Sequence, residues 1–108
     1  MKVPRTILLL ALAAHAGTAQ SQEIGDTQRG LAYVQGVCAE CHAVVPSQRA
    51  SPVATAPAFR SIAYTPGMTA TALVVWFRTP HPTMPNLMIG GEDMDNVIAY
   101  ILSLRDRR

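Results

Sequence analysis

Residues 34–42 read Val-Gln-Gly-Val-Cys-Ala-Glu-Cys-His, a short segment with two closely spaced cysteines and a histidine. It contains the pattern C-x-x-C-H, with thiols at Cys38 and Cys41 and an imidazole at His42 directly after the second thiol. Two thiols at this spacing can reach the two vinyl groups on one porphyrin edge and form thioethers, and the adjacent histidine can bind the iron. The pattern therefore predicts one covalently attached haem c, joined through Cys38 and Cys41, with His42 as the proximal ligand.

A C-x-x-C pattern has three other interpretations. A thiol–disulfide redox pair normally sits at a helix start beside a parallel sheet, and no such alternation of strands and helices is visible here. A structural zinc ion needs four ligands, and two cysteines with the adjacent His42 fall short of that number. A plain structural disulfide is the remaining alternative. Haem attachment is favoured over all three.

The first 19 residues have the layout of a secretory signal peptide. Lys2 and Arg5 give a positive start, an apolar run follows over 7–14, and small residues precede a predicted cleavage site after Ala19. An uncleaved membrane anchor is the alternative, but the apolar run is short for a bilayer span. We therefore predict a periplasmic protein without stable membrane insertion, which agrees with haem attachment because haem c is added outside the bacterial cytoplasm.

Removal of this segment leaves about 89 of the 108 residues. So short a chain buries little apolar surface and usually needs disulfide bonds or a cofactor to be stable. Two cysteines exclude a scaffold of several disulfides. The nine basic residues include Lys2 and Arg5, so the seven arginines that remain equal the seven acidic residues. The mature chain is therefore neutral and free of lysine, and the precursor's basic character gives no support to nucleic-acid binding.

The rest of the chain is predicted to be a flexible tail over residues 20–25 and one domain over residues 26–108. Asp26 is a good N-cap for a first helix, whose face would carry Gly30, Tyr33, Val34 and Val37 at helical spacing. Residues 43–57 are rich in Pro, Ser and Ala, which predicts a loop that wraps something.

Three further segments complete the predicted architecture. Residues 58–64 are expected to form a short helix, and Thr69 to cap another helix with Leu73, Trp76 and Phe77 on one face. Residues 79–85 contain three prolines and cannot form regular helix.

The last helix is the clearest, with acidic residues in its first turns and arginines at its solvated end. Its apolar stripe consists of Met94, Val97, Ile98, Ile101 and Leu102. No segment alternates convincingly as a strand, so an all-α domain is predicted.

The sixth iron ligand is predicted to be Met84. It lies in a proline-flanked loop far enough along the chain to return over the opposite haem face, and the prolines leave its thioether little freedom to lose. Met88 and His81 are the alternatives. Met94 is expected in the core and Met68 to contribute packing only.

These residues together resemble the class I cytochrome c family of bacteria, over about residues 26–104. The resemblance implies a cytochrome c fold of three to five short helices around one haem. It also implies that Gly30 and Tyr100 lie where the terminal helices cross, and that the Pro57 carbonyl accepts a hydrogen bond from His42. Residues 83–86 resemble the axial methionine segment, and Trp76 with Phe77 resembles the apolar wall beside the haem. Pro57, Trp76 and Tyr100 are thus expected to support the haem pocket.

The predicted function is one-electron transfer by a non-enzymatic periplasmic carrier. Its partners would be a dehydrogenase, an oxidase or another cytochrome, met in weak and transient encounters. The absence of lysine from the mature chain departs from family members that dock through a lysine ring, so that docking mode is not carried over. The alternatives are a dedicated cytochrome subunit of an exported dehydrogenase, and a haem sensor or peroxidase-type enzyme with an open distal site.

Overall fold

The computed structural model describes residues 24–80, 83–84 and 88–106. The chain there forms helices and no β-strand: α1 (Thr27–Val37), α2 (Phe59–Ala63), α3 (Ala70–Arg78), α4 (Gly91–Ser103) and the 3-10 turn η1 (Leu104–Asp106). The prediction of an all-α domain is therefore confirmed. The predicted signal peptide and the predicted tail up to residue 23 lie outside the described residues. Among the helices that are described, none has the length and apolar character that crossing a bilayer requires.

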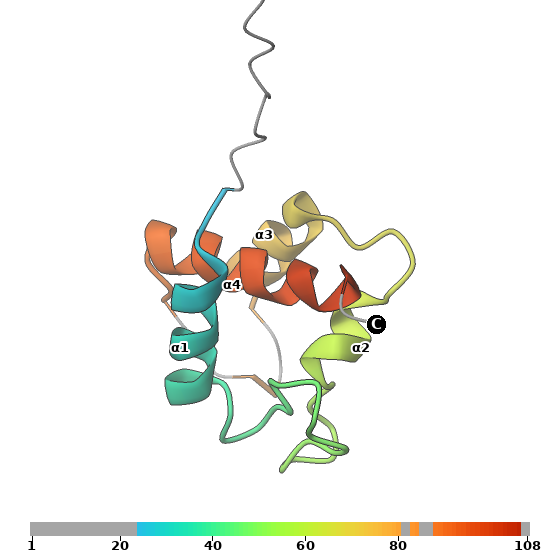
Figure 1. The fold of residues 1–108 in the computed structure, drawn as a ribbon. Helices are drawn as coiled ribbons and strands as arrows, with labels where there is room; N and C mark the ends of the chain where they lie inside the picture. The colour runs from blue at the N-terminus through green and yellow to red at the C-terminus, as the bar shows by residue number, and fades with distance from the viewer. Residues whose placement is uncertain (1–23, 81–82, 85–87, 107–108) are drawn as a thin grey trace, which may run out of the picture.

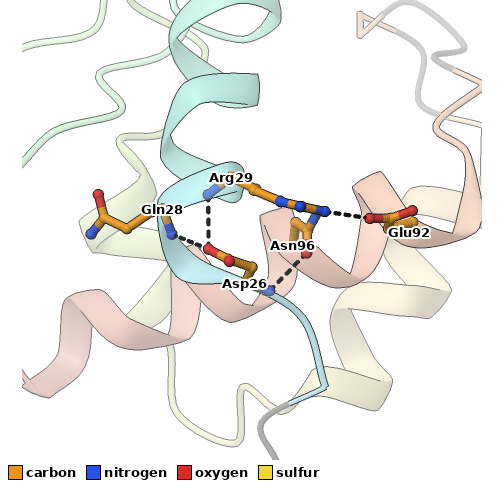
Figure 2. Close-up of polar contacts among 5 residues, drawn as sticks. All are labelled: Asp26, Gln28, Arg29, Glu92 and Asn96. Carbon is orange, nitrogen blue, oxygen red and sulfur yellow. Dashed lines mark hydrogen bonds and ion pairs between the residues drawn. The ribbon is translucent and has the colours of Figure 1, made fainter.

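The start of α1 is determined by Asp26, as its sequence predicts. The Asp26 side chain accepts hydrogen bonds from the backbone N–H groups of Gln28 at 2.8 Å and Arg29 at 3.0 Å (Figure 2). These two donors have no partner inside the helix, so the cap satisfies them. The bond from the Arg29 N–H, followed by that from Gln28, holds the pKa of the Asp26 carboxyl below its usual value of 3.8.

Long-range polar contacts join the start of α1 to α4. The backbone N–H of Asp26 donates to Oδ1 of Asn96 at 2.7 Å, and the Arg29 guanidinium forms an exposed ion pair with Glu92 at 2.8 Å (Figure 2). Asn96 is a buried polar residue, so its hydrogen bond stabilises the contact between α1 and α4. The exposed ion pair contributes little to stability. The predicted tail ends in Gly25, which has a φ of +107° and lies directly against the Asp95 carbonyl.

The two terminal helices cross in close contact (Figure 1). Gly30 lies at the crossing, where a Cβ atom would come within 2.0 Å of the Asn96 carbonyl oxygen and 2.8 Å of the Tyr100 Cβ. A side chain of any size would therefore force the helices apart. This contact places Gly30 and Tyr100 where the sequence resemblance predicts them.

Helix α4 buries the face that its periodicity predicts. Met94, Val97, Ile98 and Ile101 are buried, and Leu102 is half-buried. The arginines were predicted at the end of this helix, but the last turn of α4 contains no basic residue. Arg105 lies in η1, after α4 has ended. The core joins these side chains to residues of the other elements: Val34, Cys38, Val44, Phe59, Ala63, Leu73, Tyr100 and Leu104.

The middle of the chain follows the predicted order of loop, short helix and capped helix. Residues 43–57 form turns and bends without a helix, and α2 then packs near the C-terminal end of α4 (Figure 1). Thr69 caps α3 by accepting a hydrogen bond from the Ala72 N–H at 3.1 Å. These elements surround a space on one side of α4, and that space holds the candidate site.

Candidate functional site

A cavity of about 510 Å³ lies among the ends of α1, α2, α3 and α4. Its volume is within the range typical of small-molecule and cofactor sites. Most of its lining is apolar, and Glu40 is the only lining residue with a charged side chain among those described. Six of the residues predicted to form the site line this one cavity: Cys38, Cys41, His42, Pro57, Trp76 and Met84.

The two cysteines are presented by the turn that ends α1. Cys38 is the C-cap of α1, and its carbonyl accepts hydrogen bonds from the N–H groups of Cys41 at 3.2 Å and His42 at 3.0 Å. This tight turn brings both thiols and the imidazole to the same cavity. Cys38 is buried and Cys41 is exposed, and no disulfide joins them.

The surroundings of Cys38 are unsuited to thiol–disulfide exchange. Burial raises the pKa of the Cys38 thiol to about 11, so the thiol is protonated at neutral pH. Reactive cysteines of redox pairs instead have a lowered pKa at a helix N-terminus. Cys38 lies at the C-terminal end of α1, where the helix dipole disfavours a thiolate.

The orientation and tautomer of His42 follow from one hydrogen bond. Its Nδ1 lies 2.7 Å from the carbonyl oxygen of Pro57, as the sequence resemblance predicts. Because a carbonyl oxygen can only accept, Nδ1 must be the protonated nitrogen of the neutral ring. The other nitrogen, Nε2, therefore keeps a lone pair that can bind a metal. The ring of Phe59 lies beside the imidazole, with 5.2 Å between centroids and 54° between the ring planes.

The loop after His42 is held in shape by side-chain hydrogen bonds that its composition does not reveal. The Ala43 N–H donates to Oγ of Ser51 at 2.9 Å, and the Val44 N–H donates to Oε1 of Gln48 at 2.9 Å. The backbone then returns to the site, because the Phe59 N–H donates to the Ala43 carbonyl at 2.9 Å. These bonds bring the Pro57 carbonyl to His42 without any regular secondary structure.

Tyr100 contacts the segment that carries the site from the helix crossing. It does not line the cavity; it is 1% exposed and lies against Gly30 at the helix crossing. Its hydroxyl donates a hydrogen bond to the carbonyl of Val44, in the loop just after His42. Tyr100 thus lies at the helix crossing, where the resemblance predicts it, and it anchors that loop to α4 from outside the cavity.

Helix α3 provides the wall that its pattern predicts. Leu73, Trp76 and Phe77 all line the cavity, from one face of the helix. Leu73 is buried and belongs to the core, whereas Trp76 is 55% exposed and lies at the edge of the cavity. A bound apolar group would therefore contact the indole.

The methionines differ in whether they line the cavity, lie in the core or are exposed. Met84 is half-buried and lines the cavity, and Met68 is also half-buried and lines it. The role of Met84 as an iron ligand stays a prediction. Met94 is buried in the core, as predicted, and Met88 is 98% exposed and does not line the cavity. The alternative ligand His81 lies outside the described residues. The role of Met68 as a lining residue could not be read from its position before a helix cap.

The site thus combines two thiols, one imidazole with a free Nε2, and two thioethers around an apolar space. Within the described ranges, no three His, Cys, Asp or Glu side chains are grouped so that they could hold a metal ion by themselves. Comparisons of the chain with protein-family models, with curated proteins and with solved structures give no match.

Proposed function

We propose that this chain is an exported c-type cytochrome, which holds one covalently bound haem c and carries single electrons. The observation that carries the proposal is the convergence of Cys38, Cys41, His42 and Met84 on one apolar cavity. Met84 is remote from the other three along the chain, so this convergence is produced by the tertiary fold. The sequence pattern around Cys38 would not require it.

The residues on the cavity fit a haem. The Cys38 and Cys41 thiols would form the two thioether bonds, and Nε2 of His42 would bind the iron on one side. Met84 would supply the second protein ligand. The porphyrin itself would also bind the iron, so these two side chains would complete the ligand set, and the apolar lining would suit the ring.

The surrounding side chains have definable tasks in such a site. Haem iron supplies a one-electron change between its ferrous and ferric states, and a methionine ligand raises the reduction potential. Pro57 keeps the His42 ring oriented and increases its basicity as a ligand through the Nδ1–H bond. Phe59 and Leu73 are buried beside the site and exclude water from it.

We further infer that the helices adopt the class I cytochrome c fold and that the protein works in the periplasm after its signal peptide is removed. The close crossing of α1 and α4 at Gly30 supports the fold assignment. The layout of residues 1–19 supports export. A carrier of this kind would dock to its redox partners weakly and transiently, and a mature chain without lysine would not use a lysine ring for it.

The proposal is tested first by the colour and chemistry of the protein. Produced in a bacterial host that attaches haem c, the wild-type protein is expected to retain its haem after denaturation and extraction and to give a c-type pyridine spectrum. Cys41→Ala is expected to prevent stable covalent loading, and His42→Ala to prevent maturation because the proximal ligand is lost. A colourless wild-type protein, with both thiols free to react, would overturn the proposal.

The axial ligand is tested by a matched pair of substitutions. Met84→Leu is expected to abolish the weak long-wavelength absorption band of methionine-bound ferric haem and to lower the reduction potential. Met88→Leu is the control, because Met88 is 98% exposed and outside the cavity lining. Survival of the band in Met84→Leu would transfer the ligand role to another methionine. High-spin ferric haem in the wild-type protein, with rapid carbon monoxide binding after reduction, would favour the open-site alternative instead.

A further inference from the structure

Two hydrogen bonds join the turn after α2 to the C-terminal turn η1. The Tyr64 hydroxyl donates to the Arg105 carbonyl at 3.0 Å, and Nη1 of Arg105 donates to the Met68 carbonyl at 3.1 Å. The bonds run in opposite directions between the same two segments. They therefore connect residues 64–68 to the end of the chain at two points.

This turn forms part of the cavity wall. Thr65 and Met68 line the cavity, and Met68 is half-buried and packs against the hydrophobic core. The turn is closed by a hydrogen bond from the Met68 N–H to the Thr65 carbonyl at 3.0 Å, with Gly67 at a φ of +76°. Its conformation thus depends on local bonds and on the two contacts with η1.

The guanidinium of Arg105 is directed at a backbone carbonyl at a defined distance, although the residue is exposed. An arginine that interacted only with the dipole of α4 would not need a hydrogen bond to a particular carbonyl. The guanidinium of Arg60 lies over the Tyr64 ring at 5.6 Å from its centroid, on the side chain that donates to Arg105. The side chains of Arg60, Tyr64 and Arg105 thus form a chain of contacts, and its last member binds the Met68 carbonyl.

We propose that Arg105 is a positioning residue that holds Met68 against the haem and thereby keeps water from this part of the site. The inference rests on the proposed function, and it extends it to a residue outside the cavity. Ferric haem carries one more positive charge than ferrous haem, so water or other polar contacts favour the ferric state. Holding Met68 in place is therefore expected to keep the reduction potential high.

The test compares Arg105→Gln with Arg105→Lys in the haem-loaded protein. Arg105→Gln is expected to lower the midpoint potential, and Arg105→Lys, which retains a charged donor, to restore part of the shift. Tyr64→Phe removes the hydrogen bond to the Arg105 carbonyl but keeps the aromatic ring, and it is also expected to lower the midpoint potential. Arg49→Gln is the matched control, because Arg49 is exposed and does not line the cavity.

A purely structural role is separated from positioning by two further measurements. Asn96→Ala removes a hydrogen bond at the distant helix crossing, and it is expected to lower the unfolding temperature while leaving the potential at the wild-type value. In a Met68→Ala background, Arg105→Gln is expected to cause no further shift, because the side chain that it positions is gone. The inference is overturned if Arg105→Gln leaves the potential unchanged or shifts it equally in both backgrounds. Failure of the wild-type protein to bind haem would instead overturn the proposed function itself.

Discussion

The contact between the terminal helices makes Gly30→Ala the sharpest test of the fold. A Cβ at residue 30 would lie 2.0 Å from the Asn96 carbonyl oxygen and 2.7 Å from its carbonyl carbon. Both are backbone atoms of α4, which cannot move aside as a flexible side chain can. The two helices must therefore separate, and the packing around Val34 and Val97, both 0% exposed, must loosen with them.

The expected size of the effect follows from two opposing contributions. Overpacking of a core contact costs about 1–3 kcal/mol, and a clash with backbone belongs near the upper end of that range. Alanine is favoured over glycine inside a helix by about 1 kcal/mol, which offsets part of the cost. The net loss is about 2 kcal/mol, which lowers the unfolding temperature of a domain this small by roughly 8–16 °C.

The assay is thermal unfolding of the protein carrying the proposed haem, followed by far-ultraviolet circular dichroism. Gly36→Ala is the matched control, because Gly36 lies on the same helix and nothing lies within 4 Å of the position that its Cβ would occupy. It is expected to leave stability unchanged or to raise it by up to about 1 kcal/mol. If Gly30→Ala were as stable as Gly36→Ala, the close crossing of α1 and α4 would be wrong.

Two other substitutions test the polar contacts of the fold. Asp26→Asn keeps a good N-cap at neutral pH but removes a carboxyl whose pKa is lowered in the folded state. The ionised carboxyl stabilises the folded protein above pH 3.8. This stabilisation is lost as the pH falls through the lower pKa of the folded state. The urea midpoint of the wild-type protein should therefore fall more steeply than that of Asp26→Asn between about pH 5 and pH 2, and parallel curves would refute this. Tyr100→Phe leaves the Val44 carbonyl without its buried donor and should lower the free energy of unfolding by about 1–3 kcal/mol. The absorption spectrum of the proposed haem should stay unchanged, because Tyr100 does not line the cavity. An unchanged unfolding temperature would show that this hydrogen bond contributes nothing to stability.

The capping residues and helix faces were predictable because their signals act within one or two turns of chain. Asp26 and Thr69 cap the helices that follow them, as predicted, through bonds to N–H groups two or three residues away. The buried face of α4 follows from the 3.6-residue period alone. Such features depend on neighbouring residues and need no knowledge of the rest of the fold.

The candidate site was predictable in part for a chemical reason. C-x-x-C-H places three reactive groups so close along the chain that any compact conformation brings them together. Met84 was favoured from its prolines and its distance from His42. The lining role of Met68 is not predictable from its neighbours, because its side chain reaches the cavity through a turn that contacts Arg105, far along the chain.

The helical class, the helix caps, the buried face of α4 and the thiol–imidazole pattern follow from residues close to one another in the chain, so they can be predicted without the tertiary structure. The contacts of Gly30 with the Asn96 backbone and of Tyr100 with the Val44 carbonyl, in contrast, depend on the tertiary structure. It also decided which methionines reach the cavity. These outcomes depend on how the helices cross, and that crossing is set by the packing of many side chains at once.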